Sequence, residues 1–433
     1  MDEMVDARVT PSMTARRAGE IAASFDLRDL PDDFYANPYP VYAQLRQAEP
    51  IRRMPDGSIF LTRHADLCAV YRDARAFSSD KKVEFAPKYG AAAPLFEHHT
   101  SSLVFSDPPL HTRVRRIIMG ALTRRAIAQI EPALATLVER LLDAIETEGG
   151  GDLIADFASA IPIEVIGNLL AVPQAERTPL RAWSLAILGA LEPRLTSEQE
   201  ALGNQSVSQF KDYLKQLVAQ RRRQPGDPEH DVLTRLIQAD GIDGSGEELS
   251  ETELLHNCIF ILNAGHETTT NLIGNALASL QEWPDQRKQL LAGLHATQTN
   301  AEQQDSLLDL AVEEFLRFES SNQLGNRRCV QDFELPGMRL APGSLVTLCI
   351  GAANRDPAMY EDADSLNLLR APNRHLAFGL GPHQCAGMSL ARLEGRVAIS
   401  HFLQRFPAYR LIGAPQRARR ARFRGFLSAP FNV

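Results

Sequence analysis

The sequence lacks the features that would mark a secreted scaffold, a zinc site, a membrane protein or a nucleic-acid-binding protein. Its five cysteines are odd in number, widely spaced and without a C-x-x-C pair, which excludes a disulfide framework and a clustered zinc site. The N-terminal stretch MDEMVDARVTPSMTARRAGE has early acids and no apolar run of signal-peptide length. A net charge of -8 excludes a general attraction to nucleic acid or anionic membranes. We therefore expect a globular protein of the cytoplasm.

Helical spacing of apolar residues dominates the chain from Thr112 to Leu403. Strand signals are short and local, such as the two runs on either side of the Asp56-Gly57 turn. No long linker and no repeat of fixed period interrupts the pattern. We predict a mainly α protein with small β-sheets, made of a flexible N-terminal tail over residues 1–24 and one domain over residues 25–433.

One long helix is predicted between Ser250 and Trp283. Ser250 and Glu253 form a capping box at its start, and Pro284 stops it. Its centre, NAGHETTTN, opposes helix formation, because a glycine there costs about 1 kcal/mol relative to alanine and three consecutive threonines compete for backbone carbonyls. Local rules broken in mid-helix indicate a functional role.

The same centre places small residues on one face of the helix. Ile261, Ala264, Gly265 and Thr268 share this face at helical spacing. A flat group could lie close against the backbone there. Alternatively, the two small residues admit a neighbouring helix.

Cys385 is the one cysteine that lies in a glycine-rich loop, FGLGPHQCAG. Gly379, Gly381 and Gly387 permit tight turns with positive φ, and a helical run follows from about Ala386. A helix N-terminus favours a thiolate, so these are conditions for an anionic sulfur ligand. Without the glycine spacing, a buried inert cysteine would be the ordinary interpretation.

Several motifs then give a family resemblance. Phe378, Gly381, His383, Cys385 and Gly387 match the F-x-x-G-x-[H/R]-x-C-x-G haem-binding signature, so the chain resembles the haem-thiolate monooxygenases, the cytochrome P-450 superfamily, of the soluble bacterial type. AGHETT is similar to the family's oxygen-activation motif, and EEFLR contains its E-x-x-R pair. NRDP, LARLE and DPPLHTRVRR are similar to other family segments, and the resemblance extends from about Pro38 to the C-terminus.

The resemblance implies a single triangular haem domain with haem b between the long helix and the cysteine loop. Cys385 would be the axial thiolate, which pushes electron density onto the iron and favours cleavage of the O–O bond. Arg327 is preferred over the adjacent Arg328 as a propionate ligand because of its offset before Asp332. The full set that the resemblance implies for haem contact is His111, Arg115, Ala264, Gly265, Arg327, His375, Phe378, Gly381, His383 and Gly387.

Two further roles follow from the resemblance. Thr268 would hold a water or the bound ligand, and Glu267 would relay protons to it. The alternative is a threonine that back-bonds to its own helix beside an exposed glutamate. Glu314 and Arg317 would form a partly buried structural network with Arg370, although Leu366-Asn367 replaces the Phe-Asp that bacterial relatives usually carry before this arginine.

The implied reaction is monooxygenation. One atom of O₂ would enter an apolar organic small molecule, most simply by hydroxylation, with electrons from NAD(P)H delivered by a ferredoxin reductase and a ferredoxin. We expect a monomer that binds neither a membrane nor nucleic acid. Arg113 and Arg116 are expected to lie in the face that docks the ferredoxin. The basic segment QRARRARFRG is interpreted as a solvated loop. The rival functions are a peroxide-driven peroxygenase and a non-catalytic haem-binding or sensor protein.

Overall fold

The computed structural model describes residues 12–228, 231–238, 249–297 and 300–433. Its helices are α1 (Ala15–Ala23), α2 (Asp32–Ala36), α3 (Tyr39–Ala48), α4 (His64–Arg72), α5 (Lys82–Tyr89), α6 (Pro94–Ser101), α7 (Leu110–Ala121), α8 (Arg124–Glu148), α9 (Ala160–Leu169), α10 (Leu180–Gly189), α11 (Ser197–Arg223), α12 (Val232–Ile237), α14 (Glu251–Glu282), α15 (Pro284–Ala296), α16 (Ala301–Phe318), α17 (Ile350–Ala353) and α18 (Met388–Arg405). Its strands are β1 (Ile51–Arg53), β2 (Ile59–Leu61), β3 (Phe77–Ser78), β4 (Gly150–Asp152), β5 (Leu324–Cys329), β6 (Phe333–Leu335), β7 (Met338–Leu340), β8 (Leu345–Cys349), β9 (Arg410–Leu411), β10 (Gln416–Arg417), β11 (Phe426–Ser428) and β12 (Pro430–Asn432). The predicted class, mainly α with small sheets, is confirmed. No helix in the described ranges is long and apolar enough to cross a membrane.

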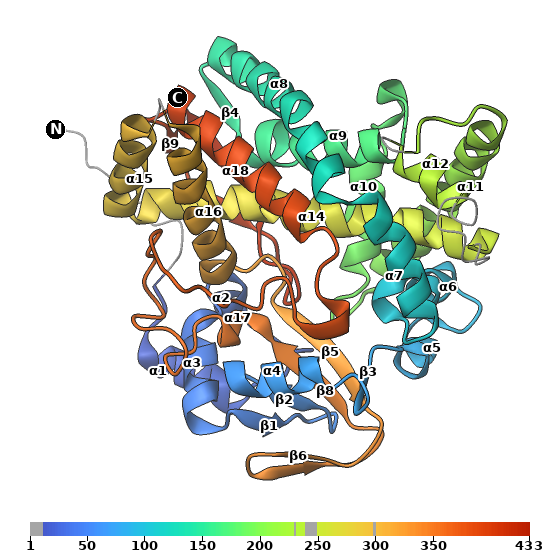
Figure 1. The fold of residues 1–433 in the computed structure, drawn as a ribbon. Coiled ribbons are helices and arrows are strands. Elements are labelled where there is room, and N and C mark those ends of the chain that lie inside the picture. Colours follow the sequence, from blue (N-terminus) through green and yellow to red (C-terminus); the bar gives the residue numbers. More distant parts are fainter. Residues whose placement is uncertain (1–11, 229–230, 239–248, 298–299) are drawn as a thin grey trace.

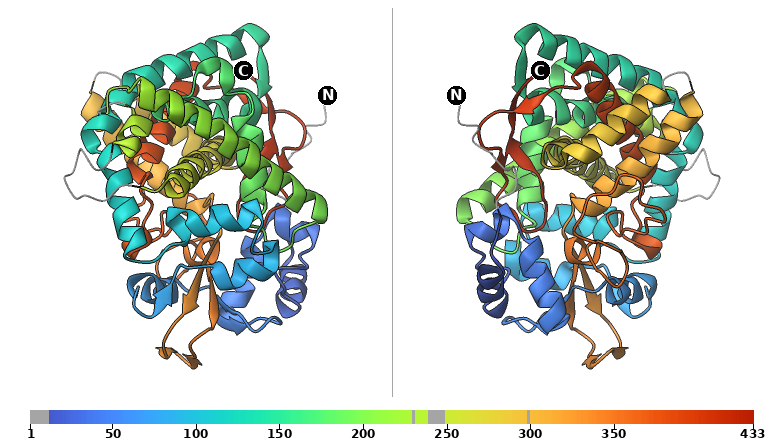
Figure 2. Two further views of the ribbon diagram at one scale, coloured as in Figure 1. Left: turned by 90° about the vertical axis from the view of Figure 1, so that its right-hand side faces the viewer. Right: turned by 90° about the vertical axis from the view of Figure 1, so that its left-hand side faces the viewer.

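The long helix α14 crosses the whole molecule, as predicted. The Ser250 side chain accepts from the backbone N–H of Glu253, and the Glu253 carboxylate accepts from the backbone N–H of Ser250. The helix ends at Trp283, directly before Pro284. Figure 1 shows α14 running through the centre, and Figure 2 views it nearly end-on with other helices around it.

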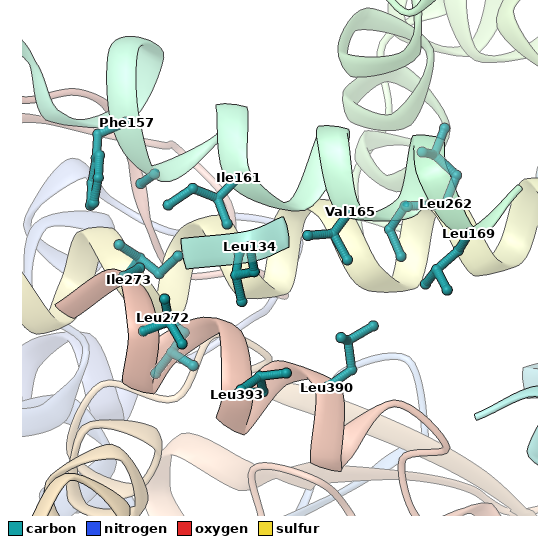
Figure 3. Packing of buried hydrophobic residues seen from close by; sticks show 14 of the residues in the cluster. Leu134, Phe157, Ile161, Val165, Leu169, Leu262, Leu272, Ile273, Leu390 and Leu393 are labelled. Carbon is teal, nitrogen blue, oxygen red and sulfur yellow. The ribbon is translucent and has the colours of Figure 1, made fainter. Parts of the chain in front are cut away.

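The core around α14 is built from two helices that pack on opposite sides of it. Figure 3 shows side chains of α9 above α14 and of α18 below it, with Leu262 near α9 and Leu272 near α18. Leu262 is fully buried, and a Cβ on Gly395 of α18 would come within 3.0 Å of the Leu272 side chain, so α18 approaches α14 closely at a glycine. This packing fixes the segment before α18, which contains Cys385, relative to the middle of α14.

A five-stranded sheet lies below α14 in the view of Figure 1, with α1 to α4 beside it. Its strand order is β1-β2-β8-β5-β3, where β2 and β8 are parallel and the other pairs antiparallel. The hairpin β1-β2 turns at Gly57, whose φ of 83° only glycine adopts readily, so the predicted turn is confirmed. Strand β5 follows the E-x-x-R helix α16 and carries Arg327 toward the interior.

The N-terminal boundary differs from the prediction. Helix α1 begins after an N-cap at Thr14, and Ala18, Ile21 and Ala22 are buried in a core cluster with residues of α3. Residues 15–23 therefore belong to the packed body and not to a flexible tail over 1–24, because their apolar face is covered. Residues 1–11 lie outside the described part of the chain. The assignment of residues 25–433 to one domain stays a prediction.

Candidate functional site

The middle of α14 presents an accessible stripe although most of the helix is buried. Ala264 is exposed and Ile261 and Thr268 are half-buried, whereas the flanking Leu262 and Asn263 are buried. Accessible surface in the centre of a helix that crosses the core means that protein side chains do not cover this face. The stripe is the face that the sequence predicted for a flat group.

Gly265 has a different role from its neighbour Ala264. A Cβ at Gly265 would lie 2.7 Å from Cδ1 of Ile166, which belongs to α9. The absence of a side chain at Gly265 therefore lets Ile166 of α9 approach closely, which agrees with the helix-crossing alternative. This packing gives no evidence for the predicted contact between Gly265 and the cofactor.

The cysteine loop takes the turns that its glycines allow. Gly379 and Gly381 have φ values of 66° and 74°, and a side chain on Gly381 would collide with the backbone carbonyl of Tyr71. The backbone N–H of Cys385 donates to the carbonyl of Phe378 at 2.8 Å, which closes the loop. Gly387 differs, since its φ is -90° and a Cβ there would meet no atom within 4 Å.

The electrostatics around Cys385 contain opposing contributions. Burial raises the pKa of its thiol, while the backbone N–H of Gly387 and the cations Arg115 and Arg392 lower it. The Arg392 guanidinium lies 4.8 Å from the Phe378 ring centroid. A sulfur with an amide N–H and two cations nearby is suited to bind a metal as a thiolate.

Four of the predicted haem-contacting residues gather near one another, and the Asp107 carboxylate acts on two of them, His111 and Arg327. The rings of His111 and His383 lie 3.9 Å apart, and His111 Nε2 is buried without a hydrogen-bond partner. Burial, followed by Arg327, His111 and Arg115, lowers the pKa of His383 to about 2. Two arginines and two imidazoles near a single carboxylate leave an excess of cations and donors, which fits an anionic group such as a haem propionate.

The choice between the adjacent arginines is also consistent with the structure. Arg328 forms an ion pair with Glu84 at 2.7 Å. Arg327 has no carboxylate partner within the described residues and donates to the Asn326 carbonyl at 2.8 Å. Arg327 is therefore the one of the two that remains available to an anionic ligand.

His375, which is also predicted to contact a propionate, has partners within the protein, and its contact with haem stays a prediction. Its Nε2 lies 3.2 Å from Glu313 Oε2, and its Nδ1 accepts from the backbone N–H of Ala377. Glu313 also pairs with Arg392 at 2.6 Å. Because a protein carboxylate already partners this imidazole, the geometry does not support a propionate contact by His375.

Glu267 and Thr268, the predicted proton relay, are neighbours on α14 but have different hydrogen-bond partners. The Thr268 hydroxyl donates to the Ala264 carbonyl at 2.7 Å, which is the back-bond of the alternative interpretation. Glu267 is buried and ion-pairs with Arg420, so the idea of an exposed glutamate is wrong. Burial raises the pKa of Glu267, and Arg420 lowers it. Glu267 Oε2 has no hydrogen-bond partner, so one oxygen of the carboxylate remains free to accept a proton donor.

The basic segment near the C-terminus is not a solvated loop, which corrects the prediction. Arg424 is buried and pairs with Glu319 at 2.6 Å, and Arg417 donates to Asn275 at 3.0 Å. Arg420 reaches Glu267, as described above. The sequence showed alternate arginines at 420, 422 and 424, but their acidic partners lie far away in the chain and carried no readable signal.

Glu314, Arg317 and Arg370 form the predicted network. Arg317 Nε donates to Glu314 at 2.7 Å, and Arg370 Nε lies 3.2 Å from the same carboxylate. Arg317 and Glu314 side chains are 0% exposed. The backbone N–H of Asn367 also donates to Glu314 at 2.8 Å, so the departure at Leu366-Asn367 keeps the network intact.

The predicted docking helix is only partly as expected. Arg116 is exposed on α7, but Arg113 is half-buried and ion-pairs with Glu253 at 2.5 Å. An arginine bound to a carboxylate of its own chain is less available to an acidic partner. This corrects the assignment of Arg113, while Arg116 stays a prediction.

Comparison with known proteins agrees with this geometry. A sequence profile of the Cytochrome P450 family matches residues 185–411. The "Polyketide biosynthesis cytochrome P450 PksS" of Bacillus subtilis is 32% identical over 93% of this chain and 97% of its own length, and the "Vitamin D(3) 25-hydroxylase" of Pseudonocardia autotrophica is 36% identical over 84% and 85%. The crystal structure of P450BioI in complex with hexadec-9Z-enoic acid ligated acyl carrier protein matches with a TM-score of 0.83 and 31% identity, over 93% of this chain and 99% of that one. The chain therefore belongs to the cytochrome P450 family of haem-thiolate monooxygenases.

Proposed function

We propose that this protein is a haem b monooxygenase that inserts one atom of O₂ into an apolar organic small molecule, by hydroxylation, with electrons from NAD(P)H through a ferredoxin reductase and a ferredoxin. One observation carries the proposal. The buried acid Glu267 and the alcohol Thr268 flank the accessible stripe of α14, and the helix α18 that packs on α14 begins directly after the Cys385 loop. This arrangement supplies a thiolate, an open backbone face and a proton donor within one site.

The chain's own residues have separable tasks in this scheme. When bound, haem supplies the iron at which O₂ is reduced. Cys385 would hold the haem iron through its thiolate, and His111, Arg115 and Arg327 would hold the propionates. Glu267 and the Thr268 hydroxyl move protons toward the accessible stripe, while Arg420 controls the charge of Glu267.

The neighbourhood of Ala264 supports an apolar substrate, since Ile261 and Ala264 present only hydrocarbon there. Two relatives carry the words 25-hydroxylase and hydroxylase/epoxidase in their names, which supports hydroxylation as the outcome. The buried Glu267 and the adjacent Thr268 count against a peroxide-driven peroxygenase, because direct use of peroxide needs no such relay. The five free cysteines support a reducing compartment such as the cytoplasm.

Two comparisons of variants test the proposal. Cys385→Ala is expected to abolish the Soret band that marks a thiolate-ligated haem in the reduced CO complex, whereas Cys258→Ala, which changes another buried cysteine, should keep it. Persistence of that band in Cys385→Ala would disprove the assignment of the ligand. A band of the imidazole-ligated type in the unmodified protein would instead favour a sensor.

The relay is tested with a matched pair of threonines. Thr268 and Thr270 both donate to the carbonyl four residues earlier, at 2.7 Å and 2.9 Å, but only Thr268 adjoins the accessible stripe. Thr268→Ala should divert electrons from NAD(P)H to hydrogen peroxide while haem content stays unchanged, and Thr270→Ala should not. Equal peroxide yields from the two variants, or turnover with peroxide alone at an undiminished rate, would contradict the proposal.

A further inference from the structure

Two cations near the proposed site have no carboxylate partner in the described part of the chain. Lys81, directly before α5, is 3% exposed, and its Nζ has no hydrogen-bond partner. Arg422, in the loop between β10 and β11, donates from Nη1 to the Leu324 carbonyl at 2.9 Å and from Nη2 to Asn326 Oδ1, while its Nε has no partner. We call these two residues the Lys81–Arg422 pair.

Two acids lie near these cations. Glu84 acts to raise the pKa of Lys81, and Glu192 acts to raise the pKa of Arg422. Both Glu84 oxygens are buried without a hydrogen-bond partner. Glu84 forms its ion pair with Arg328 at 2.7 Å. Glu192 accepts from the backbone N–H groups of Ala421 and Arg422 at 2.8 and 3.2 Å, so its oxygens hold the loop and not the guanidinium. A buried cation without a counter-charge is costly, and an anion that enters the site offsets that cost.

The titration behaviour agrees with an excess of positive charge. The pKa of Lys81 is lowered to about 8, chiefly by burial; Glu84 acts to raise it, and Arg327, Arg328 and Arg422 act to lower it. Burial, with a contribution from Arg422, also lowers the pKa of Lys88 to about 8. Arg422 therefore lies close enough to both lysines to repel each of them.

The pair lies on the reacting side of the molecule. Arg420, two residues before Arg422, is bound to Glu267, and two extended residues span roughly 7 Å. The same loop forms an isolated antiparallel bridge between Phe423 and Asn322, which lies two residues before β5. The Ser321 hydroxyl, next to this bridge, donates to the Thr268 carbonyl at 2.8 Å. A ligand held at Arg422 can thus extend its body toward the accessible stripe of α14.

We propose that Lys81 and Arg422 form an anion subsite that binds the carboxylate of the substrate, so that the substrate is an apolar organic acid. The unpartnered Nε–H of Arg422 and the Lys81 ammonium can each donate to an oxygen of a carboxylate. This inference rests on the proposed function, because it assigns the substrate class of that same site. The other source of the same chemistry is a haem propionate, since Arg327 and Arg422 both contact Asn326.

The test compares two probes that share an apolar chain, dodecanoate and dodecanamide, by equilibrium dialysis with the haem-loaded protein. The unmodified protein should bind dodecanoate about tenfold or more tightly than the amide, as expected for a charge-assisted pair. Lys81→Met and Arg422→Gln should each remove most of this preference, and Lys81→Arg should retain it. Lys82→Met and Arg419→Gln are matched controls, because these neighbours are exposed, and both should behave like the unmodified protein.

The outcomes separate the possible sources of the anion. An unmodified protein with no preference for dodecanoate, or a Lys81→Met variant that keeps the preference, overturns the proposal. If Lys81→Met loses haem faster to apomyoglobin while its haem-loaded fraction keeps the preference, the lysine serves a propionate and the proposal is wrong. Because dialysis needs no turnover, a preference without any oxygenated product would leave the subsite standing and refute the monooxygenase function alone.

Discussion

Arg317 offers the sharpest test of how the cysteine loop is supported. Its guanidinium makes five hydrogen bonds, two to the Glu314 carboxylate and one each to the carbonyls of Asn354, Ala363 and Ser365. The three carbonyls belong to the segment 354–365, which precedes the cysteine loop in the chain, and the Arg317 side chain is 0% exposed. The residue therefore ties α16 to the segment that leads to Cys385.

The magnitude follows from counting donors. An ammonium has three donors, whereas the guanidinium uses five, so Arg317→Lys loses at least two of these hydrogen bonds, at about 1–3 kcal/mol each. The expected loss in free energy of unfolding is about 2–6 kcal/mol, a large part of the roughly 5–15 kcal/mol that stabilises a typical protein. Arg317→Leu should not accumulate as a folded haem protein, because it also leaves the buried Glu314 with Arg370 as its remaining cation.

The assay is urea unfolding followed by circular dichroism, together with haem content by pyridine haemochrome. Arg339→Lys is the control, since Arg339 is 65% exposed in its ion pair with Asp332 and should change stability by less than about 0.5 kcal/mol. The folded fraction of Arg317→Lys should retain the spectrum of a thiolate-ligated haem. If Arg317→Lys and Arg339→Lys unfold at the same urea concentration, the network does not support the loop in the way described.

Two further predictions concern buried carboxylates. Burial raises the pKa of Glu394 from 4.5 to about 8, so between these values the folded protein holds a proton that the unfolded chain has released, and the free energy of unfolding falls by about 1.4 kcal/mol per pH unit as pH rises. Glu394→Gln should remove this slope, which urea titrations at the two ends of the window will show; an unchanged slope contradicts it. Arg420→Gln, which removes the cation from Glu267, should raise the hydrogen peroxide released per NAD(P)H consumed several-fold, whereas Arg419→Gln, at an exposed ion pair, should not. Identical peroxide yields would show that the Arg420 contact does not control proton delivery.

The local features of the chain were predictable because their causes lie within a few residues. The Ser250–Glu253 capping box and Pro284 determine where α14 begins and ends, and both are adjacent in sequence to the ends they set. The glycines around Cys385 predicted positive φ values, and the structure has them at Gly379 and Gly381. Here local backbone preference and the fold agree.

The predictions that the structure does not support concern residues whose partners are distant in the chain. The tail over residues 1–24 was expected to be flexible, yet α1 packs on α3, because burial of an apolar face depends on the element that covers it. The sequence predicted that the arginine-rich segment 417–424 is a charged surface loop, and that His375 is a propionate ligand. Their partners, Glu267, Glu319 and Glu313, carry no mark in the sequence that links them to these cations.

The sequence by itself determined the fold class, the long helix and the single cysteine suited to hold iron, since these follow from periodicity, capping and a motif of fixed spacing. Only the tertiary structure decided which charges are neutralised. Arg328 and Arg420 form ion pairs with carboxylates, whereas neither Lys81 Nζ nor Arg422 Nε has a hydrogen-bond partner within the described residues. The physical reason is that the free energy of a charge depends on burial and on neighbours brought together by folding, and neither quantity can be read from the order of residues along the chain.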